Sequence, residues 1–221
     1  NIMLGSGWSV MAELSHGGLS DYLRELAELK IHAFACSETP DTPRITTRPG
    51  GKRLARMLSL LNGFLPNAIP FINTGLEVNE LQPLNCGLAD NTGGAAIPRA
   101  FFNRMQIAWQ QNHDMFDLLC QIAQRRQGLS ELLRPQHFFM QMAAAPLLSF
   151  GYRRGEEWLH LVCNIDLTES VPLPPELLAQ RDGLALILDS YQESSIREED
   201  IPMQVGPQQA LLLWHIHPVR E

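Results

Sequence analysis

The sequence predicts an α/β fold followed by an all-β part. In its first part, short apolar runs at 31–36 and 68–72 are separated by segments whose leucines have helical spacing. Strand, helix and strand in that order are typical of a parallel sheet. After Pro135 the chain changes to short strands separated by turn residues, which is typical of an antiparallel β-sandwich. We therefore expect two domains, at 1–135 and 136–221.

The composition excludes several classes of partner. The 221 residues carry a formal net charge of −7 and show no basic footprint for nucleic acid or for an anionic membrane. No apolar run approaches the length that spans a bilayer. Four cysteines are scattered without a C-x-x-C pair, so we expect buried thiols, with a disulfide or a zinc site as the less favoured alternatives: Cys36, Cys86, Cys120 and Cys163.

The beginning of the chain resembles the interior of a longer protein. The first residue is not Met, and 1–4 has the pattern of the end of a strand, so we expect a fragment. Residues 5–9 are predicted to form a flexible loop. Its Trp8 either stacks on a sugar ring or covers the rim of the fold, and the two interpretations have equal weight. Leu19, Leu23 and Leu26 then mark the apolar face of a helix.

A buried strand at 31–36 is expected to deliver polar groups to a working surface. Pro40 and Pro43 cannot continue a ladder of hydrogen bonds, so the chain turns outward there. Glu38, Asp41 and Arg44 then follow the carboxyl end of the strand. In parallel α/β proteins that end is where substrates bind.

The next segment, 45–56, contains or adjoins five basic residues around Pro49-Gly50-Gly51. It lacks the phosphate-loop pattern, so we expect a helix that exposes a basic face to water: Arg44, Arg48, Lys52, Arg53 and Arg56. A leucine stripe over 54–65 marks the buried side of that helix. The strand at 68–72 follows, and Gly75 and Glu77 after it are expected to lie at the same edge as Asp41.

The remaining segments are predicted from periodicity and turn residues. Helices are expected at 101–111 and 115–126, with Asn112-His113-Asp114 between them as a helix cap. A short helical turn follows at 128–134 and Pro135 closes it. Strands are expected at 137–144, 147–152, 158–165, 184–189, 203–205 and 210–216. His215 and His217 share one face of the last strand, and without a third ligand a surface edge strand is favoured over a metal site.

Two stretches of this sequence resemble the last two conserved blocks of the α-amylase family, glycoside hydrolase family 13. The first is Glu38-Thr-Pro-Asp41, and the second is Pro70-Phe-Ile-Asn-Thr-Gly75-Leu-Glu77. The family usually has Glu/Asp-Asn-His-Asp at the end of barrel strand seven and Gly-x-Pro-x-x-Tyr-x-Gly-x-Glu at strand eight. Here Pro40 replaces the histidine, and Asn73 occupies the tyrosine position. The context is similar to bacterial amylase-like and maltosyltransferase-like members.

The resemblance implies a fold. It places the last two to three βα units of a (β/α)8 TIM barrel at 1–135 and the family's C-terminal β domain at 136–221. It also implies that the intact protein is a glycoside hydrolase or transglycosylase that acts on an α-glucan or maltooligosaccharide by a retaining mechanism. The nucleophile and the acid/base would lie upstream of this chain, which alone is expected to be inactive.

The resemblance also implies roles for single residues. Asp41 would be the third acid, which stabilises the transition state by binding sugar hydroxyls. The residues expected to bind substrate are Glu38, Arg44, Glu77, Trp8 and Asn79. No cofactor or metal is expected; calcium occurs in the family, but no calcium site is readable here.

Two alternatives stay open at this stage. A non-catalytic glucan-binding relative would explain Pro40, because proline cannot donate the hydrogen bond that the family's histidine gives to the sugar. A small interaction protein, complete in itself, would instead melt cooperatively as a monomer. The sequence leaves open the linkage specificity, the choice between hydrolysis and transfer, the oligomeric state and the compartment, with the cytoplasm slightly favoured.

Overall fold

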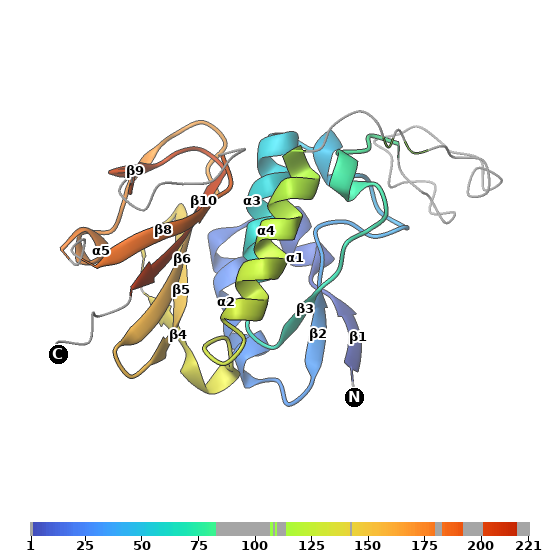
Figure 1. Cartoon of the computed structure of the whole chain (residues 1–221). Helices are drawn as coiled ribbons and strands as arrows, with labels where there is room; N and C mark the ends of the chain where they lie inside the picture. Colours follow the sequence, from blue (N-terminus) through green and yellow to red (C-terminus); the bar gives the residue numbers. More distant parts are fainter. Residues whose placement is uncertain are drawn as a thin grey trace.

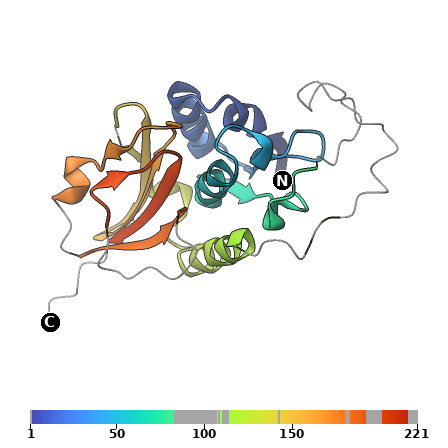
Figure 2. The ribbon, with the colours of Figure 1, turned by 90° about the horizontal axis from the view of Figure 1, so that it is seen from above.

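The structure, a computed structural model, describes residues 2–82, 107, 109, 114–141, 143–179, 183–191 and 201–215. A parallel sheet and an antiparallel sheet lie on opposite sides of a layer of helices (Figure 1). Helix α3 (Lys52–Gly63) occupies the middle of that layer, as the view from above also shows (Figure 2). The predicted order, α/β first and antiparallel β second, is confirmed.

The parallel sheet has three strands in the order β1-β2-β3. They are β1 (Ile2–Ser6), β2 (His32–Ala35) and β3 (Ala68–Pro70). Helices α1 (Trp8–Glu13) and α2 (His16–Glu28) connect the first pair, and α3 connects the second. Both strand pairs are parallel, as strands joined by helical crossovers should be.

The predicted loop at 5–9 is wrong. Strand β1 runs to Ser6, and Trp8 already begins α1, so Gly7 alone makes the change of direction. A Cβ at Gly7 would overlap the hydroxyl end of the Tyr22 side chain, so a larger residue would require that ring to move. The stretch contains two glycines and two serines, a composition typical of a loop. The chain nevertheless turns from strand to helix within one residue.

The two faces of the parallel sheet differ in burial. Ala33, Ala35 and Ala68 belong to the buried core and face the helices. Phe34 and Ile69 point the other way and are only half-buried. Phe71, which follows β3, is 38% exposed and packs edge-on against Phe34. The sheet therefore has one covered face and one apolar face that the described residues leave partly open.

Local signals explain the helices. Ser15 caps α2, because its Oγ accepts a hydrogen bond from the backbone N–H of Gly18 at 3.2 Å. The apolar stripe of α2 is buried as predicted, at Leu19, Leu23 and Leu26. Helix α3 is buried on every side from Leu54 to Gly63, because both sheets and α4 (Asp114–Gly128) surround it.

The antiparallel sheet has five strands in the order β4-β5-β6-β10-β8. Their bounds agree with the predicted ones to within three residues: β4 (Phe138–Gln141), β5 (Leu147–Arg154), β6 (Glu157–Asn164), β8 (Leu184–Asp189) and β10 (Gln209–His215). A two-stranded sheet of β7 (Val171–Pro172) and β9 (Gln204–Val205) lies nearby with α5 (Pro175–Leu178). The expectation that the last strand is a surface edge strand is wrong, because β10 lies between β6 and β8 and its His215 is buried. The barrel and the sandwich themselves stay predictions.

Short 3-10 helices complete the described chain: η1 (Ile45–Thr47), η2 (Leu76–Val78) and η4 (Pro135–His137). Pro135 therefore begins a helical turn, where we expected it to end one. This position suits proline, because the first residue of a helix has no use for its backbone N–H. No helix in the described ranges is long and apolar enough to cross a membrane.

One apolar core extends across both parts of the chain. It joins side chains of α2, α3 and α4 to Leu148, Phe150 and Tyr152 of β5. The opposite face of the antiparallel sheet has a second core, which includes Leu173, Leu177 and Val205. The two sheets are therefore packed against a common set of helices.

The expected exposure of the basic residues around α3 is partly wrong. Arg44 and Arg56 are buried, and Arg48 donates to the carbonyls of Met11 and Ala12 at the end of α1, while Lys52 and Arg53 are exposed. Arg56 Nε donates to the carbonyl of Ser190, 134 residues away, whereas Arg44 binds both the nearby carboxylate of Glu38 and the distant carbonyl of Gln82.

The cysteines with described positions behave largely as expected. Cys36 and Cys163 are buried, Cys120 is partly buried, and all three are thiols outside any disulfide. Burial raises the pKa of the Cys163 thiol. Cys86, His217, Asn112 and His113, as well as most of the helix expected at 101–111, lie outside the described residues.

Candidate functional site

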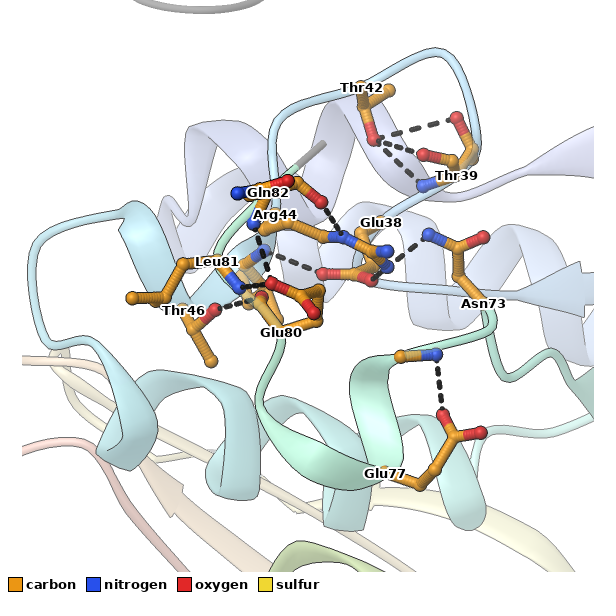
Figure 3. A network of polar contacts seen from close by, with 12 residues as sticks. Glu38, Thr39, Thr42, Arg44, Thr46, Asn73, Glu77, Glu80, Leu81 and Gln82 are labelled. Carbon is orange, nitrogen blue, oxygen red and sulfur yellow. Dashed lines mark hydrogen bonds and ion pairs between the residues drawn. The ribbon is translucent and has the colours of Figure 1, made fainter. Parts of the chain in front are cut away.

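The candidate site begins where β2 ends. Glu38 lies three residues beyond β2 and is only 2% exposed. Its Oε1 accepts hydrogen bonds from Arg44 Nη1 at 2.7 Å and from Asn73 Nδ2 at 3.0 Å. Its Oε2 accepts from the backbone N–H of Ile45 at 2.7 Å. Both carboxylate oxygens are therefore bonded to protein groups, which fix the loop that follows β2 (Figure 3).

Arg44 joins the loop after β2 to the segment after β3. Its side chain is 1% exposed, and its Nε donates to the carbonyl of Gln82 at 2.8 Å while Nη1 pairs with Glu38. Thr46 adds a parallel contact, because its hydroxyl donates to the carbonyl of Glu80 at 2.9 Å. A buried arginine of this kind holds several segments at once through its fixed fork of donors.

The segment after β3 is shaped by residues with unusual backbone angles. Gly75 has a φ of 100°, and a Cβ there would lie 2.9 Å from Arg44 Nη2, so both the conformation and the space require glycine. Asn79 has a φ of 54° and ends η2. The carboxylate of Glu77 accepts from the backbone N–H of Gly75 at 2.8 Å. These contacts make a compact turn immediately beside the Glu38–Arg44 pair.

Asp41 lies at the outer side of a tight turn between Glu38 and Arg44. Thr42 stabilises this turn, since its Oγ1 accepts from the backbone N–H of Thr39 at 2.7 Å. The N–H of Asp41 donates to the Thr39 hydroxyl at 3.2 Å, and the Asp41 side chain is exposed. The carboxylate is therefore presented at the surface by a loop whose base is buried and hydrogen-bonded.

The structure thus brings some of the predicted residues together and leaves others apart. Glu38 and Arg44 contact each other, and Glu77 lies in the adjoining turn (Figure 3). Trp8 is the half-buried first residue of α1, on the element that follows β1. Asn79 is 6% exposed, and neither atom of its amide has a hydrogen-bond partner. The predicted substrate contacts of all these residues stay predictions.

Sequence reasoning missed the part that Asn73 plays. We identified it only as the residue at the family's tyrosine position, whereas it is 2% exposed and donates to Glu38. Asn73 directly follows the strand predicted at 68–72, and an amide at the same strand edge as Glu38 is a signal that could have found it. Thr46 was missed too, because a threonine inside a basic segment carries no distinctive pattern.

The arrangement can orient a carboxylate but offers no complete metal site. Among the residues whose positions are described, no group of three or more His, Cys, Asp or Glu side chains is placed to hold a metal ion. Asp41 is held in place by a rigid base, so it can accept hydrogen bonds from a ligand at the surface at little cost in ordering. Such a carboxylate can bind hydroxyl groups.

Comparisons with solved structures find the same fold in sugar-acting proteins. The α-amylase from Anoxybacillus matches with a TM-score of 0.65 and 14% identity, over 100% of this chain and 48% of that one. The trehalose-6-phosphate hydrolase of Bacillus licheniformis matches with a TM-score of 0.63 and 14% identity, over 97% and 51%. The isomaltulose synthase from Klebsiella sp. LX3 matches with a TM-score of 0.63 and 13% identity, over 90% of this chain and 46% of that one.

These structural neighbours are members of the α-amylase family, the family that the sequence resembles. At such low identity the likeness establishes the fold, and the chain spans about half the length of the proteins that it matches. No family model matches the sequence. No curated protein matches it either.

Proposed function

We propose that this chain is part of an α-amylase-family glycoside hydrolase or transglycosylase that acts on α-glucans by a retaining mechanism. The observation that carries the proposal is the Glu38–Arg44–Asn73 network, which joins the carboxyl ends of two neighbouring parallel strands and presents Asp41 beside them. The fold that the chain shares with α-amylase and trehalose-6-phosphate hydrolase supports the same assignment.

In this proposal Asp41 stabilises the transition state. Its carboxylate accepts hydrogen bonds from two sugar hydroxyls, and these bonds strengthen as the ring flattens and gains positive charge at its anomeric carbon. Glu38 and Arg44 act as positioning residues, because both carboxylate oxygens of Glu38 and the Nε and Nη1 of Arg44 bind protein groups. The nucleophile and the acid/base would come from polypeptide that is not part of this chain.

The test compares two exposed aspartates on different elements. In the intact protein, Asp41→Asn should lower kcat on a maltooligosaccharide by about 10²–10³-fold, because it removes charge that acts mainly in the transition state. Asp21→Asn, on the exposed face of α2, should leave kcat within twofold of the parent. Equal kcat values for Asp41→Asn and the parent would contradict the proposed role.

A second candidate function is a glucan-binding relative without catalysis. Pro40 favours it, because a proline ring cannot donate the hydrogen bond that the histidine of the family gives to the same sugar. In that case Asp41→Asn would weaken the binding of maltooligosaccharide, measured by calorimetry, while the parent protein shows no turnover. Turnover by the parent protein would exclude this candidate.

A further inference from the structure

A pocket of about 240 Å³ opens between α3, α4 and the ends of β2 and β3. Its walls are largely apolar and include Leu76, Leu119 and Ile122, with the exposed Phe71 and Ile72 among the side chains that line it. None of the residues assigned above to sugar binding lines it. The pocket is therefore a feature separate from the candidate carbohydrate site.

Two polar side chains of α3 face this apolar space. Ser59 and Asn62 both line the pocket, are three residues apart and so lie on one face of the helix. They are 7% and 4% exposed, and neither Ser59 Oγ nor Asn62 Oδ1 has a hydrogen-bond partner. Buried polar atoms without a partner are rare in folded proteins and call for an explanation.

The charges around the pocket define what could satisfy these atoms. Arg126 is the cation that lines it, and its Nη1 and Nη2 donate to the carbonyls of Gly63 and Ala68. No acidic side chain lines the pocket among the residues that the structure describes. The unsatisfied atoms are a hydroxyl and an amide oxygen, and a carboxylate placed against the amide oxygen would bring lone pairs together. A neutral head group fits better than an anion.

We propose that this pocket binds a small neutral alcohol with a compact apolar body. The ligand hydroxyl donates to Asn62 Oδ1 and accepts from the Ser59 hydroxyl, so that one group satisfies both orphan atoms. The apolar body lies against Leu119 and Ile122. A water molecule occupies about 30 Å³ in the liquid, so the pocket holds a ligand of roughly eight non-hydrogen atoms.

Benzyl alcohol is a suitable probe because toluene has the same ring without the hydroxyl. Titration of the purified protein with each compound can be followed through the NMR signals of the Ile122 methyl groups. We expect benzyl alcohol to bind about fivefold more tightly than toluene, which reverses the preference that an entirely apolar cavity would show. Tighter binding of toluene, or no shift with either compound at millimolar concentration, would overturn the proposal.

Variants distinguish the effect of the polar atoms on binding from the effect of the pocket volume. Ser59→Ala should weaken benzyl alcohol about fivefold and leave toluene unchanged, since only the alcohol uses the hydroxyl. Ala123→Phe should block both compounds from the rim of the pocket, whereas Gln124→Phe, exposed on the same helix and outside the lining, should block neither. If Ala123→Phe fails to fold, the Ser59→Ala result alone decides. Equal affinity of Ser59→Ala and parent for benzyl alcohol would refute the assigned contact.

Discussion

Glu38 and Arg44 form a buried ion pair, which stabilises the fold only while both side chains are charged. Their side chains are 2% and 1% exposed. Neutralising one partner leaves the other charge buried without compensation, at a cost of roughly 3–5 kcal/mol. We expect Glu38→Gln to lower the free energy of unfolding by about 3 kcal/mol or more, measured by urea titration at pH 7.

An exposed ion pair provides the control for that measurement. Glu131 and Arg134 also form a contact, but more than half of each side chain is exposed. Because water screens such pairs, Glu131→Gln should cost less than about 1 kcal/mol. Similar losses for the two variants would mean that the Glu38–Arg44 pair has no special role in holding the loop.

His160 gives the stability a dependence on pH. It packs edge-on against Phe139 and Trp158, and burial, followed by the neighbouring His215, lowers its pKa to about 4. The unfolded chain has a histidine pKa near 6.5, so it binds the proton first as the pH falls. The buried neutral His160 therefore has its full stabilising effect above about pH 6.5. As the pH falls toward 4, the free energy of unfolding decreases by roughly 3 kcal/mol.

The corresponding measurement is the difference in unfolding free energy between pH 7 and pH 4.5. His160→Gln should reduce this difference, because the variant has no imidazole to protonate at that position. His32→Gln, at the exposed first residue of β2, should leave the difference as it is in the parent. A parent-like pH dependence in His160→Gln would assign the effect to other groups.

At the scale of elements, one hydrogen bond joins the antiparallel sheet to the end of α3. The hydroxyl of Tyr152 on β5 donates to the carbonyl of Phe64, the residue that caps α3, at 2.7 Å. Burial raises the pKa of this hydroxyl. Tyr152→Phe should cost about 1–2 kcal/mol in urea unfolding, because the buried carbonyl loses its donor.

Tyr191 offers a matched comparison near the end of β8. Its hydroxyl donates to the carbonyl of Pro207, but the side chain is 38% exposed. Water can replace the lost hydroxyl there, so Tyr191→Phe should cost less than about 0.5 kcal/mol. A loss as large as that of Tyr152→Phe would contradict the distinction by burial.

The elements were predictable where periodicity alone decides them. The leucines of α2 and α3 and the short runs between turn residues at β5 and β6 are local patterns, and the observed elements follow them closely. The burial of Arg56 was not predictable in this way. Its Nε donates to the carbonyl of Ser190, which is 134 residues away, and only the folded chain brings them together.

The candidate site shows the same division. The sequence pattern identified the segment that carries Asp41 and the glycine at position 75. It assigned Glu38 and Arg44 to the substrate, which stays a prediction, but it could not show that both carboxylate oxygens of Glu38 and two nitrogens of Arg44 bind other parts of the protein. Residue type and spacing reveal which groups gather at a strand end, but the direction of each side chain depends on packing.

At the scale of the whole molecule, the partly open apolar face of the parallel sheet should control association. Phe34, Ile69 and Phe71 present this face. We expect the 221-residue chain alone to self-associate at micromolar concentration, because contiguous exposed apolar surface favours contacts between copies. Phe71→Ser should lower the associated fraction in sedimentation velocity without loss of the folded state.

Leu167 provides the control for this prediction. It is 46% exposed but lies in a turn of the second part of the chain, away from the parallel sheet. Leu167→Ser should leave the associated fraction unchanged. A parent chain that sediments as a monomer would contradict the prediction, and it would favour the alternative of a self-contained interaction protein.

The position of α3 between the two sheets has a consequence for how such a protein can change over evolution. A recombination event near Pro135 would transfer β4–β10 without the helix against which β6 and β10 pack. A recipient would then need its own helix with large aliphatic residues at the same places. Inheritance of the C-terminal strands should therefore be coupled to that of α3, although more than seventy residues separate them in the gene.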